Sequence, residues 1–208
     1  MGVLVGKPAP DFTAPAVLGN GEIVDDYSFS KATKGKKAVV FFYPLDFTFV
    51  CPSELLAFDH RYEEFKKRGV EVIGVSIDSH FTHNAWRNTP IKDGGIGAVK
   101  YALVADITHA IAKAYDVESE GGVAFRGSFL IDEEGMVRHQ VVNDLPLGRN
   151  VDETDRKGLD LLEPLLAILA GSGKSFVWAV TRERAEWAQI DAGAQVLAEH
   201  VAALRMGL

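Results

Sequence analysis

The sequence has only one cysteine, Cys51, among its 208 residues. A single thiol cannot form a disulfide within the chain, so internal disulfide bonds are excluded. No apolar run approaches the ~20 residues that a membrane-spanning helix needs. The net charge of −7 gives no reason to expect nucleic acid or an anionic membrane as a partner. Pro8 and Pro10 come too early in the chain for a signal peptide, so we expect a cytoplasmic location.

Two patterns that could indicate a cofactor are incomplete. His80 and His83 stand three residues apart, but no acidic or cysteine partner completes a set of metal ligands. The segment LAGSGKS (169–175) resembles a phosphate-binding loop, yet Ile168 occupies the position of the first glycine that this motif requires. We therefore expect neither a metal nor a nucleotide cofactor.

Strands and helices alternate along the middle of the sequence. Continuous apolar runs, typical of strands buried on both faces, are followed by segments with helical spacing of their apolar residues. We expect strands at 36–43, 70–78, 101–106, 127–132 and 136–142, and helices at 53–69, 80–90 and 108–117. Gly69 supplies a helix stop, and Glu133-Glu134-Gly135 a hairpin turn. This order predicts an α/β fold with a mixed sheet and helices on both of its faces.

Cys51 lies where an apolar strand turns into a helix. Pro52 fits the first position of that helix, which places Cys51 at its cap. The thiolate is the reactive form of cysteine, and a helix terminus stabilises an anion by only about 1 to 2 kcal/mol at best. A reactive Cys51 therefore needs a further cation, for which Arg126 is a candidate. The alternative is that Cys51 is a small buried hydrophobic residue, and these residues alone leave both interpretations open.

The segment PLDFTFVCPSELLAF (44–58) resembles the active-site loop of the peroxiredoxins, Pro-x-x-x-Thr-x-x-Cys, with Pro44, Thr48 and Cys51 in the defined positions. Further similar segments occur in register over about residues 3–154: VGKPAPDF, GVSIDSHFTHNAWRNTP, YALVAD, AFRGSFLID and NDLPLGRNVDET. Together they resemble the typical two-cysteine, alkyl hydroperoxide reductase C type of peroxiredoxin.

The resemblance implies a thioredoxin-like fold and a thiol-dependent peroxidase that reduces hydrogen peroxide and organic hydroperoxides without a cofactor. Cys51 corresponds to the cysteine that peroxide oxidises to a sulfenic acid. Thr48 corresponds to the hydroxyl that hydrogen-bonds the peroxide and the thiolate, and Arg126 to the guanidinium that stabilises negative charge. Pro44 corresponds to the residue that shields the loop from water, and Glu54 to the carboxylate that orients the arginine. The resemblance also implies a homo-oligomer, a dimer or a ring of dimers such as a decamer.

After about residue 154 the sequence departs from the family. Relatives of this type carry a resolving cysteine in a Val-Cys-Pro segment of the C-terminal region, and this chain has no second cysteine. Ala112 also stands where we expect cysteine in close relatives. Turnover should therefore need an external thiol or a disulfide reductase. An engineered chain and a natural one-cysteine variant both fit these departures. An alternative function is that of a redox-compromised oligomeric scaffold or holdase-like assembly.

We expect the departing region, residues 155–208, to form a helical extension of the peroxiredoxin domain at 1–154. Asn150 and Glu153 resemble a capping box that opens a helix through about Ala170. A second helix is expected from Thr181, with an apolar seam at Trp187, Ile190, Ala194, Leu197, Val201 and Leu204. The seam could pack within its own subunit or between subunits, and the sequence leaves both open.

Overall fold

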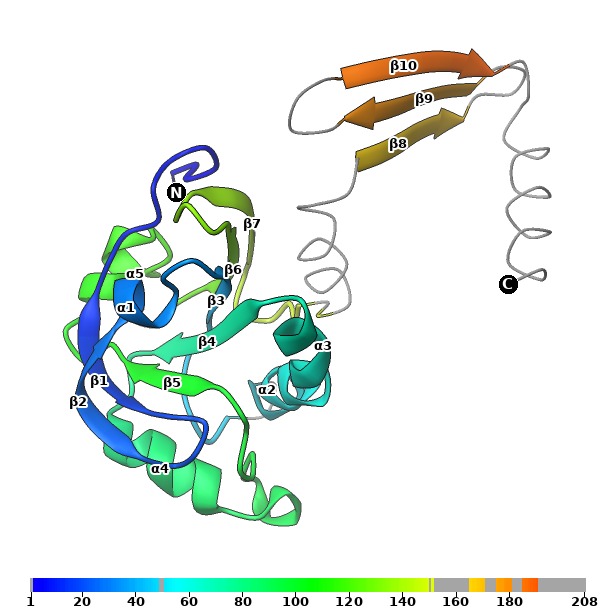
Figure 1. The fold of residues 1–208 in the computed structure, drawn as a ribbon. Coiled ribbons are helices and arrows are strands. Elements are labelled where there is room, and N and C mark those ends of the chain that lie inside the picture. Colours follow the sequence, from blue (N-terminus) through cyan, green and yellow to red (C-terminus); the bar gives the residue numbers. More distant parts are fainter. Residues whose placement is uncertain are drawn as a thin grey trace. The chain divides into compact units, whose positions relative to one another are not determined.

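A computed structural model describes residues 2–48, 51–149 and 151, together with the backbone of 165–170, 175–180 and 185–190. The chain divides into two compact units, Met1–Gly158 and Leu159–Leu208 (Figure 1). None of the helices in the described residues is long and apolar enough to cross a membrane.

The first unit contains a seven-stranded sheet with the strand order β2-β1-β5-β4-β3-β6-β7. Its strands are β1 (Thr13–Val17), β2 (Ile23–Ser28), β3 (Lys37–Phe42), β4 (Val70–Ser76), β5 (Ala102–Ala105), β6 (Arg126–Ile131) and β7 (Val137–Asn143). The three central strands β3, β4 and β5 run parallel, and the other neighbours pair antiparallel. The mixed sheet and the five strands expected from apolar runs and the hairpin signal are confirmed.

The helices of this unit are α1 (Phe29–Ala32), α2 (Cys51–His60), α3 (Tyr62–Lys67), α4 (His80–Asn88) and α5 (Ala110–Ala114), with a 3₁₀ turn at Ile91–Asp93. The single helix expected at 53–69 is thus two helices, separated at Arg61. Its predicted end is confirmed, because Gly69 adopts a left-handed φ of 68° that favours glycine. Cys51 is the first residue of α2, one position further into the helix than the cap that we expected.

Alternating residues of β3 pack on opposite faces of the sheet, as the two-residue period of a strand requires. On one face Phe41 stacks on Phe58 of α2, with ring centroids 4.1 Å apart. On the other face Phe42 lies 5.1 Å from Tyr115, in the same core cluster as Ile111 of α5. All six residues of β3 are buried. This packing fixes the position of Phe42, the last residue of β3, after which the chain continues toward Cys51.

The second unit contains a three-stranded antiparallel sheet of β8 (Leu165–Ala170), β9 (Ser175–Val180) and β10 (Ala185–Ile190), with β9 in the centre. The expectation of helices is therefore wrong for 165–170 and 185–190. A short apolar run such as LLAILA fits a helix and a strand equally well. Here it forms a strand because it pairs with SFVWAV, whose β-branched and aromatic residues favour a sheet. The remaining parts of the expected helices, including Ala194 to Leu204 of the seam, lie outside the described residues.

Candidate active site

Cys51 is fully buried at the start of α2, where the 43–48 loop connects β3 to this helix. It is a free thiol. Arg126, the first residue of β6, points its guanidinium toward the sulfur, with Nη1 3.5 Å from Sγ. The adjacent strands β3 and β6 bring the two residues together, because the loop leaves the end of β3 beside the start of β6. The structure thus supplies the cation that the sequence required near Cys51.

Arg126 is held in place by two further acceptors. Its Nη1 lies 2.6 Å from Oε2 of Glu54, and its Nε donates to the carbonyl oxygen of Leu145 at 2.8 Å. Burial works against the charge of Arg126, but the hydrogen bond to Cys51 and the charge of Glu54 together raise its pKa. Glu54 lies one helical turn after Cys51 and is itself buried, so its carboxylate orients the guanidinium at the sulfur.

A second arginine, Arg149, completes this cluster, and sequence reasoning missed it. Glu54 Oε1 accepts from its backbone N at 2.7 Å and from its Nε at 3.1 Å. The guanidinium also donates to Gly127 O at 3.0 Å, to Ser128 Oγ at 3.1 Å and to Phe42 O. Burial lowers the pKa of Arg149, and the charge of Glu54 opposes this shift. The only signal in the sequence is that Arg149 falls within NDLPLGRNVDET, a segment already noted for its resemblance to the peroxiredoxins.

The arginine cluster (Glu54, Arg126 and Arg149) contains two guanidinium groups and one carboxylate, which gives it a net charge of +1. An anion at Cys51 Sγ would neutralise this charge within a buried environment. Opposite charges within about 4 to 6 Å favour the charged form of a group. The arrangement can therefore hold a thiolate and stabilise the negative charge that develops on a departing oxygen.

Thr48 and Pro44 lie on the loop that precedes Cys51. Pro44 is buried, two residues after Phe42 ends β3. Thr48 is half-buried, and its Oγ1 donates to Leu45 O at 3.0 Å, which ties the hydroxyl to the loop's own backbone. A hydroxyl has one hydrogen, so Thr48 must release Leu45 before it can donate to a peroxide.

The same loop is attached to α4 by a group of side chains that we call the loop anchor (Tyr43, Asp46, Asp78 and His83). Asp78 is half-buried, and the other three are buried. Asp46 Oδ2 lies 2.7 Å from His83 Nδ1, and Asp46 Oδ1 accepts from the Tyr43 hydroxyl at 2.9 Å. Asp78 Oδ2 accepts from the backbone N of Asp46 at 2.8 Å. Burial raises the pKa of Asp46, and the hydrogen bond and charge of His83 oppose this shift. His83 therefore has the acidic partner that its sequence neighbours do not provide.

No group of three or more His, Cys, Asp or Glu side chains within the described part of the chain could hold a metal ion. Two aromatic residues of α4 differ in exposure. Trp86 is fully buried, with its ring centroid 6.1 Å from that of Tyr43, whereas Phe81 is 67% exposed.

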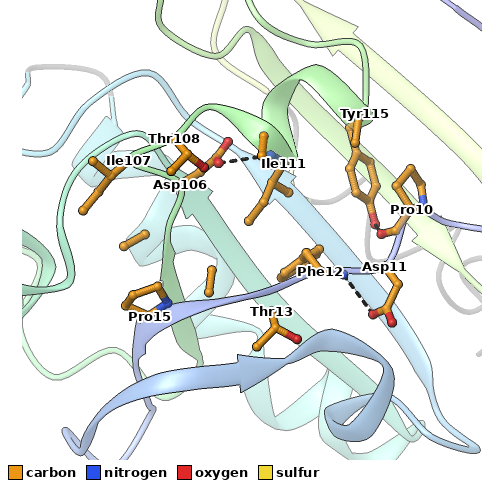
Figure 2. Close-up of a pocket in the computed structure, with 14 residues that line it drawn as sticks. Pro10, Asp11, Phe12, Thr13, Pro15, Asp106, Ile107, Thr108, Ile111 and Tyr115 are labelled. Carbon is orange, nitrogen blue, oxygen red and sulfur yellow. Dashed lines mark hydrogen bonds between the residues drawn. The ribbon is translucent and has the colours of Figure 1, made fainter.

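A large cavity lies away from these residues. It has a volume of about 490 Å³ and is lined by Pro10–Pro15 and by residues between Ala105 and Tyr115. Figure 2 shows Phe12, Ile111 and Tyr115 around it, with Asp11 and Asp106 engaged by backbone N–H groups. A second cavity, of about 470 Å³, is lined by Glu54 and Arg149 among others. Cys51 lines neither cavity, so the thiol is identified by its contacts and not by an open pocket.

Known proteins resemble this chain over most of its length. The AhpC/TSA family matches residues 5–140. Alkyl hydroperoxide reductase C of Helicobacter pylori (strain ATCC 700392 / 26695) is 56% identical over 151 residues, which cover 73% of this chain and 76% of that protein. Peroxiredoxin-1 of Gallus gallus is 55% identical over 157 residues, with the same two coverages of 73% and 76%.

Solved structures agree with the sequence matches. Reduced 2-Cys peroxiredoxin of Plasmodium vivax has a TM-score of 0.74 and 44% identity, over 77% of this chain and 82% of that chain. AhpC of Enterococcus faecalis has a TM-score of 0.69 and 36% identity, over 75% of this chain and 90% of that chain. The thioredoxin-like fold of the peroxiredoxin type is thereby confirmed. The chain belongs to the AhpC/TSA family and is a thiol-dependent peroxidase.

Proposed function

We propose that Cys51 is the thiol that the hydroperoxide oxidises, with Arg126, Glu54, Thr48 and Pro44 in the roles that the resemblance implies. The observation that carries this proposal is the contact of Arg126 Nη1 with Cys51 Sγ, 3.5 Å apart inside a buried cluster. A positive charge that lacks a negative partner is costly to bury. The thiolate form of Cys51 would supply that negative partner to Arg126, whereas the neutral thiol would not.

In the proposed reaction the thiolate attacks the terminal oxygen of the hydroperoxide, the S–O bond forms and the O–O bond breaks. The products are the Cys51 sulfenic acid and an alkoxide, which takes up a proton to become the alcohol, or water when hydrogen peroxide is the substrate. Arg126 faces the sulfur and can stabilise charge on both sides of the transferred oxygen. Thr48 provides a donor for the peroxide once its bond to Leu45 is released. Pro44 shields the start of the loop.

The sulfenic acid needs a thiol from another molecule to be reduced, since the sequence contains a single cysteine. Attack by an external thiol forms a mixed disulfide and releases water. A second thiol then reduces that disulfide and regenerates Cys51. We propose that this reductant is a small thiol or a disulfide reductase, and that the enzyme acts in the cytoplasm.

We also propose that the chain forms a homo-oligomer built from dimers, with a closed ring such as a decamer as the larger assembly. Phe47 and Phe81 support this proposal, because they are 52% and 67% exposed although both are large and apolar. One structural relative is described as an artifactual octamer of Plasmodium yoelii Prx1a modified at its N-terminus. Residues 155–208 would contribute to packing or assembly and not to the chemistry. The mass of the native assembly tests the subunit number.

The catalytic proposal is tested on the reduced full chain with one equivalent of hydrogen peroxide. We expect rapid addition of one oxygen atom, trapping by dimedone, and conversion to the sulfinic acid under excess peroxide. A Cys51→Ser variant is the control, because it removes the only thiol. Slow oxidation of a correctly folded protein would leave the scaffold or holdase-like alternative as the better function. A disulfide-linked dimer as the main product would show that Cys51 pairs with a second Cys51.

A further inference from the structure

The ring of His83 faces a hydrogen-bond acceptor at each of its two nitrogens. His83 is fully buried in α4. Nδ1 lies 2.7 Å from Asp46 Oδ2, and Nε2 lies 3.2 Å from the backbone oxygen of Val104 in β5. A carbonyl oxygen can only accept, so we assign a hydrogen to Nε2. A neutral imidazole then has a lone pair at Nδ1, directed at a carboxylate oxygen.

Two lone pairs cannot share a 2.7 Å contact without a proton between them. Either His83 is an imidazolium beside an ionised Asp46, or His83 is neutral and Asp46 is a carboxylic acid. Both arrangements contain the same single proton. The Tyr43 hydroxyl has one hydrogen, which it donates to the other carboxylate oxygen of Asp46 at 2.9 Å, and it lies 3.4 Å from His83 Nδ1, so it does not fill the shorter contact.

The surrounding charges favour retention of that proton. Asp78 approaches from the turn before α4 and adds a second carboxylate, which accepts from Asp46 N and from Ser76 Oγ. On α4 itself, Arg87 donates to the backbone oxygens of Val99 and Gly19. The contacts of the described residues thus bring two carboxylates and one imidazole together, and loss of the proton would leave two negative charges.

We propose that Asp46 and His83 share one buried proton, and that this protonated pair positions the 43–48 loop for the oxidation of Cys51. The inference rests on the proposed role of Cys51. Asp46 occupies the middle of the loop, where its side chain is bound to α4 and its backbone N to Asp78. Phe47, the next residue, has a left-handed φ of 54° that the loop must maintain.

Loss of the proton would put an unpaired charge into a fully buried site, and the loop would open to hydrate it. Thr48 lies two residues after Asp46, so it would move with the loop. Oxidation of Cys51 should therefore slow at alkaline pH, although a higher pH increases the fraction of thiolate. This descending alkaline limb distinguishes the shared proton from a simple effect of the thiol, whose ionisation can only raise the rate.

The test compares His83→Asn with His109→Asn in the full chain. The amide nitrogen of asparagine replaces Nδ1 as a donor in both variants but carries no titratable proton. His109 is a matched control, because its Nδ1 lies 2.6 Å from Glu118 Oε1 in a pair whose side chains are 28% and 23% exposed. We expect His83→Asn to slow sulfenic acid formation by about tenfold or more at neutral pH and to lack the alkaline limb. We expect His109→Asn to keep the limb and to stay within about twofold of the unsubstituted rate.

Nuclear magnetic resonance of the unsubstituted chain locates the proton directly and does not depend on the folding of a variant. We expect the shared proton to be found at neutral pH, either on His83, with both ring nitrogens protonated, or on the carboxyl group of Asp46. A neutral His83 beside an ionised Asp46 at neutral pH would overturn the inference. So would an unchanged rate profile in a folded His83→Asn variant while the unsubstituted Cys51 oxidises rapidly. Slow oxidation of the unsubstituted chain would instead overturn the proposed role of Cys51.

Discussion

The arginine cluster contacts Cys51, whereas the loop anchor holds the 43–48 loop that precedes it, and both bury charge. The arginine cluster has two guanidinium groups for one carboxylate, whereas the loop anchor has two carboxylates for one imidazole. In each, a carboxylate connects groups that are distant in sequence. Glu54 joins Arg126 to Arg149, and Asp46 joins the 43–48 loop to His83.

The difference in sign has a chemical consequence. The arginine cluster places positive charge at the sulfur, where negative charge develops during the reaction. The loop anchor places the negative charge of two carboxylates at the 43–48 loop, where the shared proton balances it in part. Buried ion pairs are weak sources of stability, but removing one partner is strongly destabilising. The two clusters therefore contribute mainly geometry, and their members should differ in whether their loss affects folding or rate.

The largest expected effect is on folding. Arg149→Ala should reduce the free energy of unfolding by about 3 to 5 kcal/mol, because it leaves the buried Glu54 without one of its partners. The guanidinium also donates to Gly127 O, Ser128 Oγ and Phe42 O, and these acceptors would lose that donor as well. Urea unfolding monitored by circular dichroism measures the loss.

Arg138→Ala is the matched control for this change. Arg138 also binds carboxylates, those of the buried Asp132 and the exposed Glu134, but its own side chain is 40% exposed. Water reaches this guanidinium, and the backbone N–H groups of Glu134 and Met136 still donate to Asp132 without it, so its loss should cost less than that of Arg149. Equal losses in the two variants would mean that burial does not distinguish Arg149.

The next largest effect is on rate. Arg126→Ala should slow the oxidation of Cys51 by roughly 10- to 150-fold, the equivalent of about 1.5 to 3 kcal/mol for a hydrogen bond to a charged group. The cause is the loss of the cation 3.5 Å from Sγ, and stopped-flow oxidation measures the effect. An unchanged rate would remove Arg126 from the site.

A smaller effect is expected at Asp132, a buried carboxylate outside both clusters. Burial favours its neutral form, but hydrogen bonds from Met136 N, Arg138 and Glu134 N outweigh this and lower its pKa. A lowered pKa contributes stability above the unfolded value of about 3.9 and loses it as the pH falls through the folded value.

Asp132→Asn should therefore reduce the free energy of unfolding by about 1.5 kcal/mol at neutral pH, and the difference should shrink as the pH falls below about 4. Unfolding curves at several pH values check this. The pKa of Asp46 is shifted in the opposite direction, so the two carboxylates should respond differently to acid. A difference for Asp132→Asn that stays constant with pH would contradict the assignment.

The sequence predicted the parts of the site that lie in or beside a recognisable motif. Cys51 and Glu54 share one helix turn, and Arg126 begins a strand whose apolar run was evident. Arg149 has no such pattern, since its partners come from β3, α2 and β6 and meet only in the folded sheet. The pair of Asp46 and His83 has no sequence pattern for the same reason, since its members lie 37 positions apart in the chain.

The C-terminal unit shows the opposite limit. Its apolar positions fit a helical period. Strand formation here depends on which segments pair, and the residues of a single segment do not predict its partner. The register Ile168–Val177 and Val177–Ala188 places three short segments in one sheet although none has a strong signal alone. Local spacing predicted β3, β4, β5 and β6 well because these strands are buried on both faces.

The smallest expected effect on the oxidation of Cys51 comes from a change in the second unit. Cys51 and both clusters belong to the unit Met1–Gly158, so we expect damage to the sheet of the other unit to leave the chemistry intact. Val177 lies in the central strand β9, with partners on both sides. Its backbone N–H must serve one of the two neighbouring strands, and proline removes that donor.

Val177→Pro should speed amide hydrogen exchange in β8, β9 and β10, while the first-turnover rate at Cys51 stays within about twofold of the unsubstituted rate. Val177→Ile is the control, because it keeps the N–H and a β-branched side chain. A loss of rate in Val177→Pro, but not in Val177→Ile, would mean that the C-terminal unit takes part in oxidation. The arginine cluster and the loop anchor would then be only part of the machinery that Cys51 requires.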